Sequence, residues 1–184
     1  MSRVYISFSA EIDIKTSEAL IAVTFDQIAK GATELYYLFS TPGGHVAQGM
    51  ALYNTIKALS IPTIMHNMGN VDSIGNAIFL AGKTRYACPY ATFMFHGVGF
   101  DLAQGQRLEQ IKAEEFLQGI LSEQKKIGGV IAHETSLVGK DIKGLFRKAQ
   151  TKDAHFALNK GIIHEIREAQ IPVGAPVVPL VFQR

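Results

Sequence analysis

Short strand-like runs alternate with helix-like segments from Arg3 to His96, and this alternation constrains the fold more than any other feature of the sequence. The runs are rich in β-branched and aromatic residues, and they end at turns punctuated by glycine and proline. Strands that are separated by helices pair in parallel through right-handed crossovers, and the helices cover the faces of the sheet. The sequence therefore predicts an α/β fold around a mainly parallel sheet.

The expected elements follow from periodicity and from the positions of glycine and proline. Strands are expected at residues 3–8, 34–39, 63–66, 84–88 and 91–95. Helices are expected at about 17–31, 50–59, 74–81, 106–127, 140–147 and 153–160. A further helical run is expected after the long helix, ending at about residue 134. Thr16 or Ser17 is expected to cap the first helix, and Gly128-Gly129 to interrupt the long one. No linker or repeat divides the chain, so residues 1–184 are expected to form one domain.

Composition excludes several classes of protein. A length of 184 residues suits a domain that buries its core without disulfides or metal ions. The charged share of 18% and the formal net charge of +2 give no argument for a nucleic-acid or membrane partner. Cys88 is the only cysteine, and we expect a core residue without a neighbouring base, in a reducing compartment. Neither a signal peptide nor a membrane-spanning apolar run is evident, so a cytoplasmic location is expected.

The first segment that could carry chemistry is Thr41-Pro42-Gly43-Gly44-His45-Val46. Paired glycines after a strand permit backbone conformations that point N–H groups at an anion. A simple tight turn explains the same residues equally well. The sequence argues against a phosphate-binding loop, because no Gly-Lys-Ser/Thr sequence follows.

Ser73 and His96 are the other two candidates, and both follow predicted strands. Ser73 lies at a turn before a helix, where a hydroxyl can be exposed beside free backbone N–H groups, although a serine there is more often a helix N-cap. The surrounding Asp72-Ser73-Ile74-Gly75 is not a Gly-x-Ser-x-Gly elbow. His96 precedes flexible Gly97 and could act as a base near neutral pH, although a lone histidine is more often structural.

In this order, the three segments resemble the proteolytic subunit of the Clp protease, ClpP. That family carries a Ser-Pro-Gly-Gly-x-Val loop, which is similar to residues 41–46, and a Gly-rich helix start, which is similar to residues 49–56. Its nucleophile segment resembles residues 69–82, and its base ends a strand similar to Met94-Phe95-His96. The resemblance covers nearly the whole chain, and it makes Ser73 and His96 a pair.

The resemblance implies a ClpP/crotonase-like fold of repeated β-β-α units, with a head at residues 1–103 and 148–184 and a protruding helical handle at roughly 104–147. It implies a serine-type endopeptidase in which Ser73 attacks the peptide carbonyl while His96 takes its proton. The backbone N–H groups of Gly44 and Ile74 would hold the oxyanion. It implies no cofactor or metal, in keeping with the lack of an i, i+4 histidine pair.

The resemblance also implies how substrates and partners are bound. His45, Val46, Gly97 and Val98 would flank an extended peptide or unfolded-protein substrate. The handle would interlock two heptameric rings of the homo-oligomer into a closed chamber. An AAA+ ATPase partner is left open, because the first strand begins at once with Val4-Tyr5-Ile6.

One departure from the family concerns the third catalytic residue, an aspartate. Counting back from Gly161, its position holds Ala149. Asp153 lies nearby but is expected to be the N-cap of the next helix. A backbone carbonyl, Asp101 or Asp141 could replace the missing acid.

Two other functions compete with an active peptidase. A catalytically weakened ClpP-like ring subunit, structural or regulatory, is favoured by Ala149 and by Asp72 beside the nucleophile, and opposed by the intact Gly44, Ser73 and His96. An acyl-CoA enzyme of the crotonase type shares the fold. It would need a carboxylate, and no suitable glutamate lies near the glycine loop or the serine loop.

Overall fold

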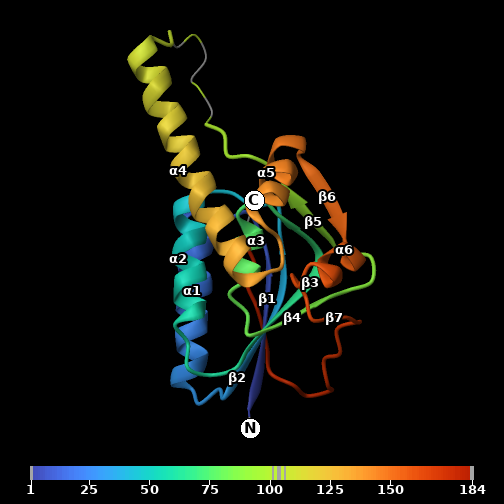
Figure 1. The fold of residues 1–184 in the computed structure, drawn as a ribbon. Helices are drawn as coiled ribbons and strands as arrows, with labels where there is room; N and C mark the ends of the chain where they lie inside the picture. Colours follow the sequence, from blue (N-terminus) through green and yellow to red (C-terminus); the bar gives the residue numbers. More distant parts are fainter. Residues whose placement is uncertain (1, 101, 103–104, 106, 183–184) are drawn as a thin grey trace.

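The computed structural model describes residues 2–100, 102, 105 and 107–182 (Figure 1). Its strands are β1 (Arg3–Ser9), β2 (Glu34–Thr41), β3 (Thr63–Asp72), β4 (Thr84–Ala87), β5 (Thr92–Phe95), β6 (Gln150–Asp153), β7 (Glu165–Ile166) and β8 (Val177–Pro179). Its helices are α1 (Ile14–Ala29), α2 (Val46–Lys57), α3 (Gly75–Phe79), α4 (Gln110–Glu134), α5 (Gly139–Lys148) and α6 (Ala154–Asn159).

The described strands form a sheet in the order β6-β5-β3-β2-β1-β8, and β4 pairs with both β3 and β7. The pairings are parallel except that of β5 with β6, which is antiparallel. The central strand β2 is buried from Leu35 to Phe39, as expected for a parallel strand covered on both faces. The predicted α/β fold with a mainly parallel sheet is confirmed.

Helices cover one face of the sheet (Figure 1), and residues of the C-terminal segment pack against the other. α1 and α2 lie side by side on one face (Figure 1), over a core in which the rings of Phe8 and Phe39 stack 5.4 Å apart. Alternate residues on the other face form a smaller cluster that includes Tyr5 and Tyr36. Because β2, β3 and β5 run in the same direction, the segments that follow them emerge at one edge.

The first helix begins earlier than expected. α1 starts at Ile14 because Asp13 caps it: Asp13 Oδ1 accepts a hydrogen bond from Thr16 N at 2.7 Å. Thr16 Oγ1 in turn accepts one from Asp13 N at 3.0 Å. Thr16 therefore closes a capping box as its third helical residue, and neither Thr16 nor Ser17 is the N-cap.

Strand β3 is longer than expected, since it continues to Asp72 instead of ending at His66. Its extension pairs with both neighbours: Val71 lies opposite Thr41 of β2 and Phe93 of β5. Sheet pairing on two sides therefore outweighs the low strand propensity of Gly69 and the residues around it.

Helix α4 is continuous, so the expected interruption at Gly128-Gly129 is wrong. Glycine disfavours a helix interior by about 1 kcal/mol relative to alanine, but tertiary packing commonly outweighs that amount. The buried residues of α4 surround the glycine pair and hold this stretch against the body: Ile127, Val130 and Ile131.

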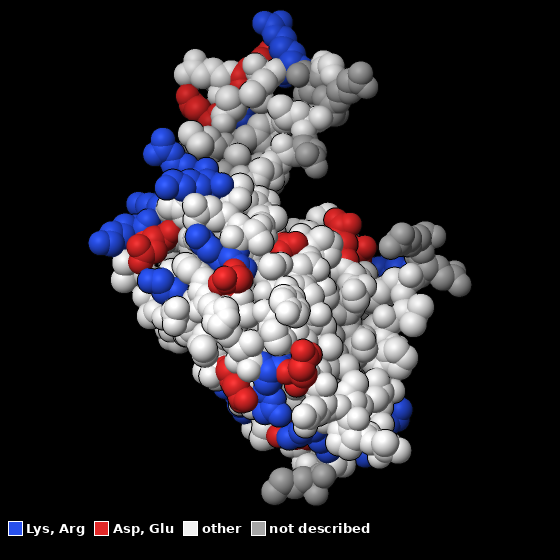
Figure 2. All heavy atoms as spheres, turned by 90° about the vertical axis from the view of Figure 1, so that its right-hand side faces the viewer, with Lys and Arg blue, Asp and Glu red and all other residues white. Residues whose placement is uncertain are grey.

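The N-terminal part of α4 stands clear of the body (Figure 1), which confirms the protruding helix. Figure 2 shows Lys, Arg, Asp and Glu side chains gathered towards its far end. Apolar side chains are exposed along the same stretch, among them Ile111 at 73%, Leu117 at 55% and Leu121 at 56%. None of the helices formed by the described residues has the length and apolar character needed to cross a membrane.

Candidate active site

Ser73 has an unusual backbone conformation. It lies between β3 and α3 with φ of 56°, in the left-handed region that costs a non-glycine residue about 1–3 kcal/mol. Its N–H donates to Met94 O at 2.9 Å, and Asn76 Nδ2 donates both to Ser73 O at 3.0 Å and to Met94 O at 2.8 Å. Ile74 is the N-cap of α3, so the interpretation of Ser73 as a helix cap is wrong.

The glycine loop packs directly against Ser73. Gly43 has φ of 95°, and a Cβ atom there would lie 2.6 Å from Ser73 Cβ. Gly44 has φ of 144°, and a Cβ atom there would lie 2.2 Å from Ile12 O. The loop is fixed from its other side, because Ile12 N donates to Gly43 O at 2.7 Å and His45 N donates to Ile12 O at 2.8 Å. Only glycine fits both positions.

Two backbone N–H groups at this turn lack an acceptor among the described residues: that of Gly44, which is exposed, and that of Ile74, which is buried. Among the hydrogen bonds of the described residues, none is donated by the N–H of Gly44 or of Ile74. Both residues adjoin the contact between the glycine loop and Ser73. Free N–H groups beside a hydroxyl are the arrangement that can stabilise a developing oxyanion.

His96 follows β5 at the same edge of the sheet. Asp72 lies opposite Met94 in the parallel pairing of β3 with β5, so Ser73 and His96 leave the ends of adjacent strands. His96 is half-buried, and its side chain makes no hydrogen bond to any described residue, including Ser73. The fold brings the two residues to neighbouring positions without joining them. Catalytic hydrogen bonds are often formed only when substrate is bound.

The antiparallel pairing of β5 with β6 decides which residue lies opposite His96. Phe95, the residue before His96, pairs with Gln150, the residue after Ala149, so the two turns adjoin the last pair of this ladder. Asp153 pairs with Thr92, four residues from His96, or ~13 Å along an extended strand. Asp153 Oδ1 accepts a hydrogen bond from Phe156 N at 2.7 Å, which confirms Asp153 as the N-cap of α6.

Two other acids were considered as the third catalytic residue, Asp141 and Asp101. Asp141 lies in the first turn of α5 and lines a cavity of about 330 Å³ with Lys140 and Lys148, a cavity in which His96 takes no part. Asp101 lies outside the described residues. No described carboxylate is hydrogen-bonded to His96.

A groove of about 470 Å³ opens beside Gly44. Three of the four residues expected to flank a substrate line this groove: His45, Val46 and Val98. The fourth, Gly97, does not line it, because its N–H donates to Phe146 O at 3.1 Å on the side of α5. Phe100 and Glu123 also line the groove and were missed in the sequence, because no local pattern shows where α4 meets the loop after β5.

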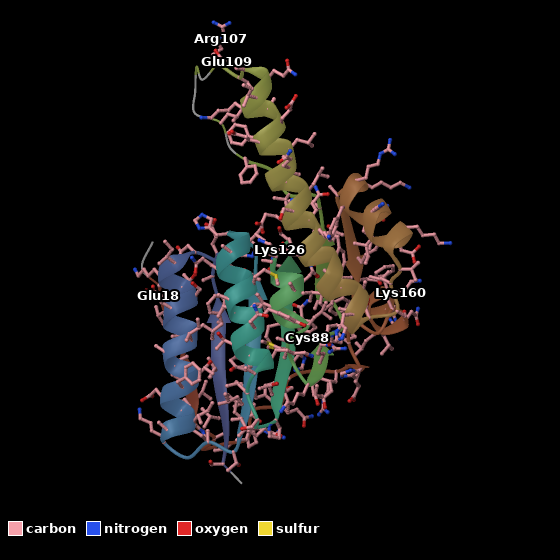
Figure 3. The ribbon with its side chains drawn as sticks, turned by 60° about the vertical axis from the view of Figure 1, so that its left-hand side comes forward. Glu18, Cys88, Arg107, Glu109, Lys126 and Lys160 are labelled. Carbon is pink, nitrogen blue, oxygen red and sulfur yellow. The ribbon has the colours of Figure 1, made fainter. Side chains whose placement is uncertain are left out.

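Cys88 has a neighbour that the sequence did not predict. Its Sγ lies 3.6 Å from His66 Nε2, so the expectation of no nearby base is wrong. His66 is fully buried and also contacts Tyr36 OH at 2.6 Å and Arg167 O at 3.0 Å. Burial lowers the pKa of His66 and raises the pKa of Cys88, so both side chains stay neutral. Figure 3 shows Cys88 within the body of the protein.

Comparisons with known proteins identify the family of this chain and match its fold. Residues 1–170 match the family model of the Clp protease. An ATP-dependent Clp protease proteolytic subunit from Arabis hirsuta is 33% identical over 112 residues, which cover 59% of this chain and only 57% of that relative. A solved structure of a mutant ClpP1 from Listeria monocytogenes shares the fold, with a TM-score of 0.79 and 20% identity over 90% of this chain and 92% of that one. Since the family model covers most of its length, this chain belongs to the Clp protease family.

Proposed function

We propose that this chain is a serine-type endopeptidase in which Ser73 is the nucleophile and His96 is its general base. The observation that carries the proposal is the left-handed backbone of Ser73, pressed against Gly43 and beside the free N–H groups of Gly44 and Ile74. A strained turn of this kind exposes a nucleophile in other hydrolases whose sequence motif differs. Membership of the Clp protease family supports the same chemistry.

The proposed reaction has two halves. Ser73 Oγ attacks the peptide carbonyl carbon while the imidazole of His96 takes the hydroxyl proton. The carbonyl oxygen becomes an oxyanion held by the N–H groups of Gly44 and Ile74, and losing one such donor costs roughly 10²–10³ in rate. His96 then gives the proton to the leaving amine, and a water molecule releases the acyl group by the reverse steps.

The proposed enzyme works as a serine–histidine dyad. By resemblance to the family, Ala149 occupies the position of the acid that would hold the imidazole of His96 in its productive orientation. In serine proteases the loss of that acid lowers turnover by about 10⁴. We therefore expect slow hydrolysis, or hydrolysis of a restricted set of substrates.

The groove beside Gly44 is the proposed binding site for an extended peptide. Residues 44–48 form one wall, and residues 98–100 form the other. The backbone of a peptide lying between them could pair with both walls as an added strand, while its side chains fill the groove.

The protruding helix supports the proposal of an oligomer. Its exposed apolar residues, including Ile111, Leu117 and Leu121, would be covered by a second copy of α4. We propose one domain with a head and a handle, as the sequence predicts, assembled into heptameric rings around a chamber by resemblance to the family. A partner ATPase stays an open part of this proposal.

Labelling with a fluorophosphonate probe tests the nucleophile. The wild-type protein should gain one phosphonyl group on Ser73, located by peptide mass mapping, and Ser73→Ala should gain none. Ser9→Ala is the matched control, because Ser9 also ends a strand and is exposed but has no left-handed backbone. A folded wild-type protein that does not react would favour the catalytically weakened ring subunit instead.

A further inference from the structure

The groove beside Gly44 contains a carboxylate that the proposed reaction does not use. Glu123, a residue of α4, lines the groove together with residues 44–48 and 98–100. Among the described residues that line the groove, Glu123 is the only carboxylate and no lysine or arginine takes part. A small cavity with a single fixed charge favours ligands of the opposite sign.

The two oxygens of Glu123 have different surroundings. Oε1 accepts a hydrogen bond from Lys126 Nζ at 2.7 Å. Oε2 is buried and has no hydrogen-bond partner in the described part of the chain, a condition shared only with Asn76 Oδ1. The side chain as a whole is 23% exposed. A carboxylate oxygen is therefore held out of water without a donor.

Such an oxygen needs an explanation, because leaving a buried acceptor unsatisfied is unfavourable and rare in folded proteins. The ion pair with Lys126 does not explain why Oε2 of Glu123 lacks a hydrogen-bond donor among the described residues. The two residues are three positions apart on a helix and the lysine side chain is 50% exposed, so the pair is a weak surface contact. Figure 3 places Lys126 on the stretch of α4 that adjoins the body. Lys126 can turn into solvent when another cation approaches.

The position of Glu123 relative to Gly44 suggests which part of a substrate it would meet. The N–H of Gly44 is the proposed donor to the attacked carbonyl, and Gly44 lines the same groove as Glu123. The side chain of the residue that carries this carbonyl is therefore the one best placed to enter the groove. The terminal torsion of a glutamate is broad, so rotation of its carboxylate can present either oxygen to that side chain.

We infer that Glu123 forms a subsite for a cationic side chain, lysine or arginine, on the substrate residue whose carbonyl Ser73 attacks. This inference rests on the proposed peptidase function and names a substrate class for it. A charge-assisted hydrogen bond to the unpartnered carboxylate would select such residues. Without Glu123, the walls formed by Val46, Val98 and Phe100 would favour an apolar side chain.

The test uses three peptidyl phosphonates of one length that differ only beside the phosphorus, with a lysine, a leucine or a glutamate side chain. The rate of adduct formation on Ser73 is followed by mass spectrometry. The wild-type protein should react about tenfold or more faster with the lysine probe than with the leucine probe, and slowest with the glutamate probe.

Variants at position 123 test whether Glu123 causes the preference for the lysine probe. Glu123→Gln keeps the shape and removes the charge, so the ratio of the lysine rate to the leucine rate should fall close to one. Glu123→Lys should reverse the order of the lysine and glutamate probes. Glu115→Gln removes a charge from an exposed position on the same helix and should leave the ratio unchanged.

The outcomes separate this inference from the proposed function. Equal labelling of Ser73 by the lysine and leucine probes overturns the subsite and leaves the peptidase standing. No labelling of Ser73 by any probe overturns both. Should the Glu123 variants fail to fold, as seen by circular dichroism, a salt titration of the wild-type protein decides. A lysine-to-leucine ratio that does not fall with added salt contradicts an electrostatic subsite.

Discussion

The two turns that flank His96 share an unusual backbone but differ in what causes it. Ser73 and Ala149 are the only described residues other than glycine with positive φ, at 56° and 47°. Ala149 is the C-cap of α5, where a left-handed residue commonly ends a helix, and its N–H returns to Leu145 O and Phe146 O. Ser73 ends no helix. Left-handed backbone therefore indicates a functional turn only where no ordinary structural cause accounts for it.

The same comparison shows which part of the machinery is present. On the side of Ser73, the glycine loop packs against the serine, the N–H groups of Gly44 and Ile74 donate no hydrogen bond among the described residues, and Asn76 donates to the backbone carbonyl of Ser73. On the side of Ala149, the residue that precedes β6 carries only a methyl group, and no described carboxylate is hydrogen-bonded to His96. The proposed nucleophile lies in a closely packed turn, whereas the proposed base has no acid hydrogen-bonded to it among the described residues.

Removing the hydroxyl is expected to have the largest effect. Ser73→Ala should abolish the enzyme-dependent hydrolysis of small fluorogenic peptides, because nothing else at this turn can form the acyl intermediate. The oligomeric state of the Ser73→Ala variant, measured by size-exclusion chromatography, should not change, since Ser73 is not one of the exposed apolar residues of α4. Turnover equal to that of the wild-type protein would end the assignment of the nucleophile.

Supplying the missing acid should change turnover in the opposite direction. Ala149→Asp places a carboxylate beside His96, and aspartate tolerates the left-handed backbone better than alanine. Turnover should rise, by up to about 10⁴-fold if the new group orients the imidazole fully. Ala149→Asn is the control, because asparagine fits the same backbone without the charge. Equal rates for the two variants would show that His96 is not limited by its orientation.

A methyl group at the glycine loop should have an intermediate effect. Gly43→Ala brings a Cβ atom to 2.6 Å from Ser73 Cβ, so the nucleophile must shift and turnover should fall about 10²-fold. Gly31→Ala is matched for backbone strain, since Gly31 has φ of 91° with nothing within 4 Å of its added Cβ. Both variants should lose stability in thermal unfolding. A loss of turnover of the same size in both would mean that strain, and not contact with Ser73, matters.

The smallest effect is expected at Asp153. Asp153→Ala removes the N-cap of α6 and should lower the free energy of unfolding by about 1 kcal/mol, whereas Asp153→Asn keeps a good cap. Both variants should retain wild-type turnover, because Asp153 lies opposite Thr92 and not His96. If Asp153→Asn loses as much activity as His96→Ala, Asp153 is the third catalytic residue after all.

The parallel sheet could be predicted because β-branched and aromatic runs alternate with helices along the chain. Strand and helix boundaries were less predictable. β3 passes through Gly69 because two neighbouring strands pair with it, and α4 passes through Gly128-Gly129 because burial holds it. Such outcomes depend on contacts between distant segments, which local patterns do not contain.

Prediction of the site depended on the order of its segments. Ser73 and His96 were ambiguous singly and became a pair through resemblance to the family. Counting back from Gly161 put Ala149 at the position of the acid, and in the structure Ala149 precedes Gln150, the partner of Phe95. Glu123 could not be found in this way, because its role depends on which face of a long helix meets the loop after β5.

The most direct test of the central claim is a crystal structure of the assembled protein with a peptidyl phosphonate bound to Ser73. We predict that the phosphonyl oxygen accepts hydrogen bonds from the N–H groups of Gly44 and Ile74, and that an imidazole nitrogen of His96 lies within about 3.2 Å of Ser73 Oγ. An adduct whose oxygen faces solvent, with His96 turned away from Ser73, would contradict the account.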